Sequence, residues 1–352
     1  MSSARYATFA LAPAVRPGGI APDGAARAHR TFLDFVVDGR PLLFRFADLD
    51  AVSPLATDVP PELLSTSARA LLLDADTPPA AGRHVIYGSP DGDGRPARGA
   101  VSAVIERDGD DVVWRDFVRQ TGDCADPTRL DADGHKDVGP YRFRATEYRA
   151  ALEGLLTTAE PAATATPARG RRVLLFGARP AVLQELASAL GSVGIATGVV
   201  SDTKDLTDEE LRGYGVVTFG RAVPEAFRRQ VLDDLARAGA VDVASFEGFA
   251  PVTPVLVAQT VDALDPTPPE RRRLTALSTA GADATVEIAS AVRVQLVAHR
   301  LDPLHRKHTK VLFDGVLEAG THRIPLGTEA EQGETFLVAR TTGGELVVPV
   351  LP

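Results

Sequence analysis

The chain has almost no cysteine, because Cys124 is the single one among its 352 residues. One cysteine excludes an internal disulfide and any metal site that needs several cysteine ligands. It also fits a reducing compartment, so we expect a cytoplasmic protein. No apolar run has the length of a membrane span, and Phe9–Ala12 is too short for the core of a signal peptide. We therefore expect no membrane partner.

The chain also has fewer basic than acidic residues. The 38 Lys and Arg residues are outnumbered by 47 Asp and Glu residues, which gives a formal net charge of −9. An acidic protein repels the phosphates of nucleic acid, so we expect no nucleic-acid partner. A hydrophobic content of 44% and a charged content of 24% are ordinary for a soluble globular protein. The length allows two or three domains.

A third absence concerns nucleotide binding. Arg172–Phe176 reads as a buried strand that leads into a helix, as at the start of a dinucleotide-binding fold. A G-x-G-x-x-G turn after Gly177 would need glycines at two further positions, which Arg179 and Val182 occupy. Those two glycines let the backbone approach a pyrophosphate and let the helix pack on the strand. The strand and helix of the fold are predicted, but the glycines that usually bind its phosphates are missing, so we expect no cofactor.

Two stretches of linker composition divide the chain. Residues 157–170 are small and polar with two prolines, and 265–270 is a shorter, proline-rich break. The predicted organisation is a flexible arm at 1–28, an α+β domain at 29–156, a linker at 157–170, a Rossmann-like α/β domain with a parallel sheet at 171–264, a linker at 265–270, and a small β-sandwich at 271–352.

The first predicted domain is mostly strands. Phe32–Gly39 predicts a strand that ends in an Asp-Gly turn, and Leu43–Phe46 follows at hairpin spacing. Further strands are expected at His84–Tyr87, Ala100–Glu106 and Val112–Phe117, with a closing helix at Glu147–Leu156.

The second predicted domain alternates strand and helix, which favours a parallel sheet with right-handed crossovers. The candidate strands are Val173–Phe176, Ile195–Val200, Val216–Phe219 and Val241–Phe246. Thr207 and Glu210 form a capping box at one helix start. The last helix, Pro254–Leu264, is apolar nearly all round, so we expect it to be buried in the domain or at an interface.

The third predicted domain is all-β. Val292, Val294 and Leu296 alternate with polar residues, as in a half-buried strand. Thr342–Glu345 predicts a hairpin turn before the last strand. A small β-sandwich is the expected closure.

Two segments resemble known proteins. Through Phe32–Gly39 and Val112–Phe117, residues 32–156 resemble small uncharacterised proteins of GC-rich bacteria that are often labelled oxidoreductases. Those relatives often place a cysteine-rich turn after the strand that ends at Tyr87, where this chain has Gly88–Gly94, so no thiol or metal role is implied there.

Residues 311–340 resemble the immunoglobulin-like (Ig-like) domain of flagellar hook-capping proteins. The resemblance rests on Val311–Gly315, Leu317–His322 and Phe336–Arg340. Such domains are structural or adhesive modules, which implies an interaction role.

The strongest internal pattern is a repeated loop with an arginine. One predicted strand runs into Gly177 and Arg179, and another runs into Gly220 and Arg221. If the strand order is 2-1-3-4, the two loops flank the crevice where open α/β sheets bind ligands. Two arginines and two helix N-termini would suit a phosphate or carboxylate, with Glu247 at the rim. The plainer interpretation, which we favour, is that Phe-Gly serves packing and turn geometry and that the arginines are solvated or paired with glutamate.

Asp202 follows the second predicted strand, at the place where an acidic residue binds a ribose hydroxyl in NAD sites. Asp is equally common in a loop before a helix. Because two fingerprint glycines are missing, we favour the loop interpretation.

The remaining polar clusters favour ordinary loops over metal or catalytic sites, and we expect no metal. Cys124 follows Asp123, whose charge would raise the pKa of the thiol, so a nucleophile is not expected. The clusters are Asp91–Gly94, Asp123–Asp126, Asp131–His135 and the basic segment His305–Lys310.

No segment supplies a catalytic signature. The leading hypothesis is a non-catalytic binding or scaffold protein with a small anion in the α/β crevice and with a protein partner or self-association. The alternative is an enzyme, an oxidoreductase or transferase, whose active site lies between the first and second domains.

Overall fold

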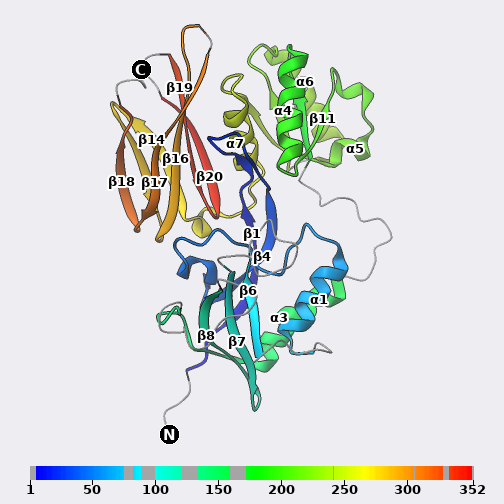
Figure 1. Cartoon of the computed structure of the whole chain (residues 1–352). Coiled ribbons are helices and arrows are strands. Elements are labelled where there is room, and N and C mark those ends of the chain that lie inside the picture. Colours follow the sequence, from blue (N-terminus) through cyan, green and yellow to red (C-terminus); the bar gives the residue numbers. More distant parts are fainter. Residues whose placement is uncertain are drawn as a thin grey trace. The chain divides into compact units, whose positions relative to one another are not determined.

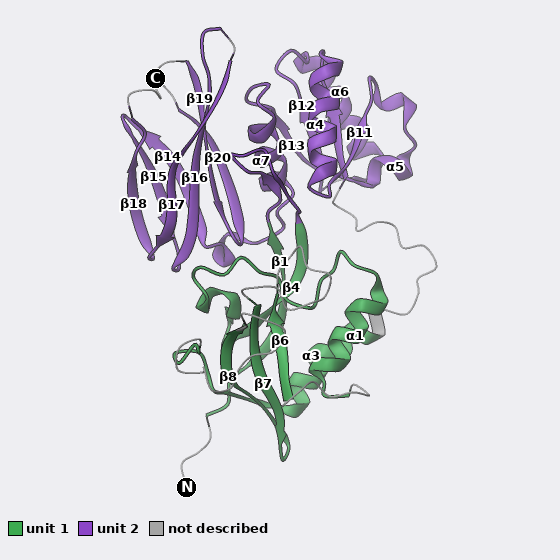
Figure 2. Cartoon of the chain, in the orientation of Figure 1, with its two compact units in different colours: residues 1–16, 30–164 green, residues 17–29, 165–352 purple. Residues whose placement is uncertain are grey.

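The computed structural model describes residues 5–74, 82–88, 100–120, 134–158, 172–240, 242–304, 306–327 and 333–350. The chain forms two compact units (Figure 2), unit 1 from residues 1–16 and 30–164 and unit 2 from residues 17–29 and 165–352. Most of the sheets are antiparallel and one is parallel (Figure 1). Where the sequence predicts three domains, the structure joins the second and third in unit 2.

In its described residues, unit 1 contains two antiparallel sheets and the α-helices α1 and α3. The sheets have the strand orders β1-β4-β5 and β6-β7-β8-β9. Asp38 and Gly39 connect β4 to β5 with φ values of 50° and 76°, as a two-residue hairpin turn requires. The elements are β1 (Phe9–Arg16), β4 (Arg30–Val37), β5 (Arg40–Pro41), α1 (Pro61–Leu71), β6 (Arg83–Tyr87), β7 (Ala100–Asp108), β8 (Asp111–Gln120), β9 (Tyr141–Arg144) and α3 (Ala145–Thr158).

The core of unit 1 is aromatic and centres on Trp114. The ring centroids of Phe35, Phe9 and Phe143 lie 5.1, 5.7 and 5.8 Å from that of Trp114, all in edge-to-face geometry. Such geometry is favourable because the positive edge of one ring meets the negative face of the next. Trp114 is fully buried, and the sheets therefore close on one shared cluster.

The strand predicted at Leu43–Phe46 is wrong. The 3-10 helix η1 (Leu42–Arg45) occupies this segment. The consecutive residues Leu42 and Leu43 are both buried. A strand would place them on opposite faces, whereas a helical turn can direct both into one core.

The flexible arm predicted at 1–28 is also corrected. Phe9–Arg16 is strand β1, and Phe9 and Val15 are buried in it. β2 (Gly19–Ile20) and β3 (Ala26–Arg27) pair as a short hairpin of unit 2. The backbone N–H of His29 donates to the carbonyl of Val193 at 2.7 Å. This segment forms strands because its few large apolar residues, such as Phe9 and Val15, are buried. Its high content of Ala, Gly and Pro makes it resemble a flexible arm in sequence.

Unit 2 contains the parallel sheet, with the order β11-β10-β12-β13. All three pairings are parallel. In chain order this is 2-1-3-4, the arrangement on which the crevice prediction depends. The strands are β10 (Arg172–Phe176), β11 (Ala196–Val199), β12 (Tyr214–Phe219) and β13 (Ala244–Glu247).

Helices cover both faces of the parallel sheet. α4 (Pro180–Ser192) and α7 (Thr253–Ala263) share a core with one face, and α5 (Asp208–Arg212) and α6 (Glu225–Arg237) share a core with the other. The capping box of Thr207 and Glu210 is present at the start of α5. α7 is buried from Val255 to Val261, within unit 2. The 3-10 turn η4 (Thr203–Asp205) precedes α5.

After α7, the described strands of unit 2 form two antiparallel sheets that share one core, with the orders β14-β15-β18 and β17-β16-β19-β20. The stretch Lys307–Lys310, predicted as a loop, is instead part of β17, because it pairs with the far end of β16. The strands are β14 (Leu274–Ala280), β15 (Asp283–Ile288), β16 (Val292–Leu301), β17 (Lys307–Leu317), β18 (Gly320–Pro325), β19 (Glu334–Thr341) and β20 (Gly344–Val350).

The predicted linker at 265–270 is a hydrogen-bonded corner in the structure. The 3-10 turn η5 (Pro269–Arg271) follows it. The Arg272 Nε donates to the carbonyl of Thr267 at 2.9 Å, and the same guanidinium pairs with Asp262 and Asp265. These polar contacts join α7 to the antiparallel sheets, which is one reason that unit 2 is compact.

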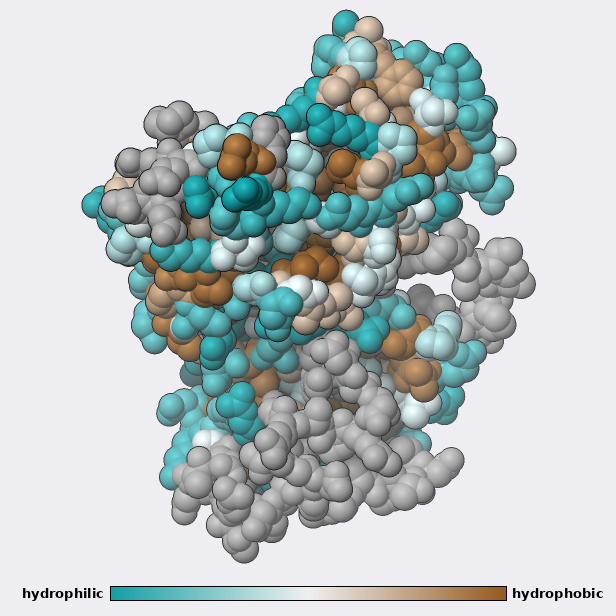
Figure 3. Space-filling model, turned by 45° about the horizontal axis from the view of Figure 1, so that its top comes forward, coloured by the Kyte–Doolittle hydropathy of each residue, from teal (hydrophilic) through white to brown (hydrophobic). Residues whose placement is uncertain are grey.

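On the surface shown in Figure 3, hydrophobic residues lie in several separate areas among hydrophilic ones. No helix in the described ranges combines the length and the apolar character that a membrane crossing needs.

Candidate functional site

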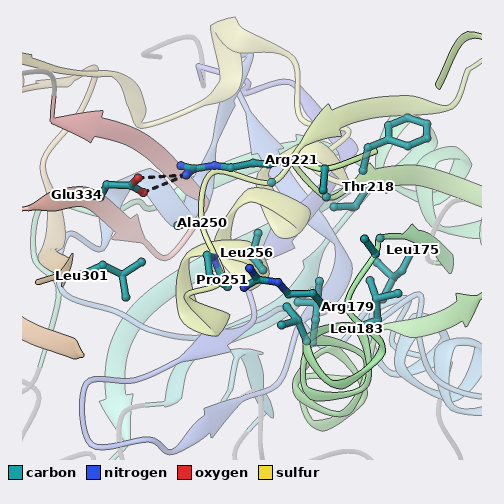
Figure 4. A pocket seen from close by; sticks show the side chains of 18 of the residues that line it. Leu175, Arg179, Leu183, Thr218, Arg221, Ala250, Pro251, Leu256, Leu301 and Glu334 are labelled. Carbon is teal, nitrogen blue, oxygen red and sulfur yellow. Dashed lines mark hydrogen bonds and ion pairs between the residues drawn. The ribbon is translucent and has the colours of Figure 1, made fainter. Parts of the chain in front are cut away.

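A cavity of about 550 Å³ lies in unit 2 at the carboxyl ends of β10 and β12 (Figure 4). Its walls come from the loops after these strands, from α4 and α7, and from the ends of β16 and β19. Cavities that hold small molecules span about 300–1,000 Å³. The position is the topological switch point of the parallel sheet, where open α/β sheets bind ligands.

Most of the wall is apolar. Leu175 belongs to β10, Leu183 and Leu186 to α4, Leu256 to α7, and Leu301 ends β16. The four residues of β10, α4 and α7 belong to the core on one face of the sheet. The cavity therefore continues the hydrophobic core outward rather than forming a polar crevice.

The wall helix α4 is fastened to its neighbours through Glu185. Its carboxylate accepts a hydrogen bond from the Thr253 hydroxyl at the start of α7 and lies 3.2 Å from the Lys307 Nζ of β17. The hydrogen bond from Thr253, followed by that from Lys307, holds the pKa of Glu185 below its ordinary value. These contacts join three elements that surround the cavity.

The two predicted glycines pack against each other's loops. The Gly220 N–H donates to the Phe176 carbonyl at 2.8 Å, and a Cβ at Gly220 would lie 3.5 Å from the Gly177 Cα. A Cβ at Gly177 would lie 3.1 Å from the Leu183 Cδ2, a tight contact. The preceding rings of Phe176 and Phe219 stack with centroids 5.7 Å apart. Close packing of the two loops thus accounts for the glycines.

Arg221 pairs with a glutamate. Its Nη1 lies 3.0 Å from the Glu334 Oε2 and 3.3 Å from the Oε1, so one nitrogen meets both oxygens (Figure 4). Glu334 is the first residue of β19, far from Arg221 in sequence. The alternative of a clamp of two free arginines is therefore wrong for Arg221, and the favoured interpretation, an arginine paired with glutamate, agrees with this contact.

Arg179 has a different environment. It lines the cavity, is exposed, and takes part in no hydrogen bond or ion pair of its side chain within the described ranges. It is also the N-cap of α4, where no side chain caps the helix and Pro180 is the first residue. The positive end of the helix dipole adds to the guanidinium charge at this wall. The cavity thus contains one unneutralised cation.

Thr218 supplies a buried hydroxyl at the same site. It lines the cavity from β12, its side chain is 5% exposed, and its Oγ1 has no hydrogen-bond partner among the described residues. A buried polar atom without a partner costs about 1–3 kcal/mol. Thr218 is aligned with Leu175 of the neighbouring strand, on the α4 side of the sheet. Its hydroxyl is an unused donor at an apolar wall.

Asp302, which lines the cavity together with Glu334, already has hydrogen-bond partners. It accepts backbone hydrogen bonds from Arg306 at 2.8 Å and Leu304 at 2.9 Å, and it lies 3.0 Å from the His308 Nε2. The hydrogen bond from the Arg306 backbone, followed by that of His308, holds the pKa of Asp302 below its ordinary value. The Asp302 carboxylate therefore stabilises the turn that follows it in the chain.

Two predicted site residues lie away from the cavity wall. Asp202 caps η4, where it accepts from the Lys204 N–H at 3.1 Å and pairs with the Lys204 Nζ at 3.3 Å. Glu247 pairs with Arg228 of α6, so its side chain belongs to the other side of the sheet. The structure brings together Gly177, Arg179, Gly220 and Arg221 at the cavity, without Asp202 and Glu247.

Sequence reasoning missed Thr218 and Glu334. Thr218 carries a weak signal, because it is the only polar side chain in the apolar run Val216–Phe219. Glu334 carries none, since its place beside Arg221 depends on how the antiparallel sheets meet the parallel one.

The remaining predictions cannot be followed in full. Asp91–Gly94, Asp123–Asp126, Cys124, His305 and residues 131–133 lie outside the described residues. Within the described part of the chain, no group of three His, Cys, Asp or Glu side chains is arranged to bind a metal ion.

The chain matches no protein-family model, no curated protein sequence and no solved structure. The resemblances of residues 32–156 and 311–340 therefore stay predictions, and the function has to be argued from the site.

Proposed function

We propose that this chain is a binding protein whose ligand is a small organic anion, held in the cavity at the ends of β10 and β12. One observation carries the proposal: an apolar cavity contains both an unpaired guanidinium, Arg179, and a buried hydroxyl without a partner, Thr218. The anionic head of the ligand would pair with Arg179, and the Thr218 hydroxyl offers the ligand a hydrogen-bond donor.

The leucine wall favours a ligand with an apolar body rather than an inorganic ion. An inorganic anion would leave the half-buried Val182 and Leu183 in contact with water, whereas an alkyl or aryl group would cover them. Burial of apolar surface contributes about 25 cal/mol per Å². The ligand class is therefore an amphipathic carboxylate.

The proposal keeps the predicted binding role and narrows its chemistry. In this account the parallel sheet is a Rossmann-like scaffold and the antiparallel sheets are an Ig-like sandwich that closes the cavity. A protein partner or self-association stays a prediction, as does the alternative of an enzyme with its site between the first two predicted domains.

Isothermal titration calorimetry with octanoate tests the proposal. We expect octanoate to bind the whole chain and Arg179→Gln to weaken binding by about tenfold to a hundredfold, because a hydrogen bond to a charged group contributes about 1.5–3 kcal/mol. The matched control is Arg323→Gln, which removes the same charge from an exposed position on β18.

Each outcome of the octanoate titration either supports or contradicts the proposed site. Binding that depends on Arg179 and is indifferent to Arg323 supports the site. No heat of binding at millimolar octanoate, or equal affinities for the wild type and Arg179→Gln, contradicts the proposal.

A further inference from the structure

The cavity contains charges of both signs, and only one of its two arginines is free. Arg221 is bound to Glu334 across the cavity, and Arg179 has no ionic partner within the described residues. Asp302 is occupied by two backbone N–H groups and His308. Among the four charged side chains that line the cavity, Arg179 is thus the one without an ionic or hydrogen-bond partner within the described residues.

Glu334 is held in place by the backbone around it. It is aligned with Leu301 in the β16–β19 ladder. The preceding residue, Gly333, has φ +121°, and a Cβ there would lie 2.2 Å from the Leu301 carbonyl oxygen. Only glycine allows the strand to begin so close to β16. The backbone position of Glu334 at the edge of the cavity is thus fixed.

Arg221 is held equally well. The Gly220 N–H bonds to the Phe176 carbonyl, and the Val223 N–H bonds to the Gly220 carbonyl at 2.9 Å. The short loop between β12 and α6 therefore presents Arg221 at a defined place, opposite Glu334.

We propose that Glu334 is the specificity-determining residue of this site and restricts it to ligands with a singly charged head group, such as a monocarboxylate. This inference rests on the proposed function. A single negative charge is neutralised by Arg179. A second negative charge, as on a phosphate monoester, would lie near the Glu334 carboxylate and would find Arg221 already paired. Like charges in a partly apolar site repel more strongly than in water.

Two probes with the same alkyl tail test this directly. Octanoate carries one negative charge, and octyl phosphate carries close to two at neutral pH. Calorimetry gives the ratio of the two dissociation constants for the wild type and for Glu334→Gln, which frees Arg221 without changing the size of the side chain. We expect the wild type to prefer octanoate and Glu334→Gln to shift the ratio toward octyl phosphate by about tenfold or more.

Two further variants show where the gain comes from. Glu334→Gln combined with Arg221→Gln removes the freed cation, so the gain for octyl phosphate is expected to disappear. Glu287→Gln removes a carboxylate from an exposed position on β15 and is expected to leave the ratio unchanged.

The inference is overturned if the wild type binds octyl phosphate as tightly as octanoate, or if Glu334→Gln leaves the ratio unchanged. Either result can occur while octanoate binding still depends on Arg179, and then the proposed function stands and only the role of Glu334 is lost. If octanoate binding does not depend on Arg179, the proposed function itself is contradicted.

Discussion

The loop after β10 and the loop after β12 share a Phe-Gly step, an arginine and a following helix, yet their arginines meet different surroundings. Arg221 is neutralised by Glu334, a residue of the antiparallel sheets, whereas Arg179 has no such partner in the described part of the chain. The glycines and phenylalanines of the two loops pack on each other. The shared residues thus build the crevice, and the difference between the arginines gives it a single free charge.

The largest expected effect comes from removing what the loops share. Phe176→Ala or Phe219→Ala leaves a cavity under both loops, because the two rings stack and are buried. We expect each to lower the free energy of unfolding of unit 2 by about 3–5 kcal/mol. Hydrogen exchange at the amides of β10 and β12 measures this loss. Leu232→Ala, on the exposed face of α6, is the control, and a similar loss there would refute the packing argument.

A second comparison sets the exposed pair Arg221–Glu334 against Arg272 with Asp262. Burial, opposed by the charge of Arg272, raises the pKa of Asp262 to about 6. A carboxyl with a raised pKa favours the folded state when protonated, so the stability of unit 2 falls as the pH rises through about 6. Melting temperatures over a pH series should show this fall, and Asp262→Asn should make it shallower, while burial also raises the pKa of Asp265 and Glu345. The effect is limited because the side chain is 34% exposed. A rise in melting temperature as the pH increases through about 6 would contradict the raised pKa of Asp262.

Thr218→Val separates stability from binding. The hydroxyl has no partner among the described residues, so its replacement by a methyl group should raise the free energy of unfolding by about 1 kcal/mol. Octanoate affinity should fall at the same time, because the ligand head loses a donor. Chemical denaturation and calorimetry on one preparation give both values. A variant that is less stable than the wild type would show that the hydroxyl is satisfied in the folded protein.

The smallest effect is expected from the ion pair itself. Both side chains of Arg221–Glu334 are about half exposed, at 48% and 55%, and such pairs contribute about 0–1 kcal/mol to stability. Glu334→Gln should therefore melt within a few degrees of the wild type. A large decrease in melting temperature would show that the pair stabilises the fold, and it would contradict the proposal that Glu334 selects ligands by their charge.

Much of the parallel sheet could be predicted from the sequence, because its signals are local. The alternation of apolar strands with helices, the capping box at Thr207 and the apolar helix α7 each depend on near neighbours in the chain. Gly177, Arg179, Gly220 and Arg221 could be placed together because parallel strands end at one edge.

The rest of the site could not be predicted, because it depends on contacts between distant segments. Glu334 reaches Arg221 only after the antiparallel sheets have packed against the parallel sheet, and Glu247 lies on the α6 side of the parallel sheet, where it pairs with Arg228. Strand β1, within the segment predicted as a flexible arm, could not be predicted for a similar reason, since its pairing partner β4 lies further along the chain.

The most direct test of the account compares the two arginines in one titration. Octanoate is titrated into the wild type, Arg179→Gln and the double variant Arg221→Gln/Glu334→Gln, which removes both members of the ion pair and leaves no unpaired carboxylate. We expect Arg179→Gln to lose about tenfold or more in affinity and the double variant to stay within about threefold of the wild type. Equal losses in the two variants, or a larger loss for the double variant, would contradict the central claim.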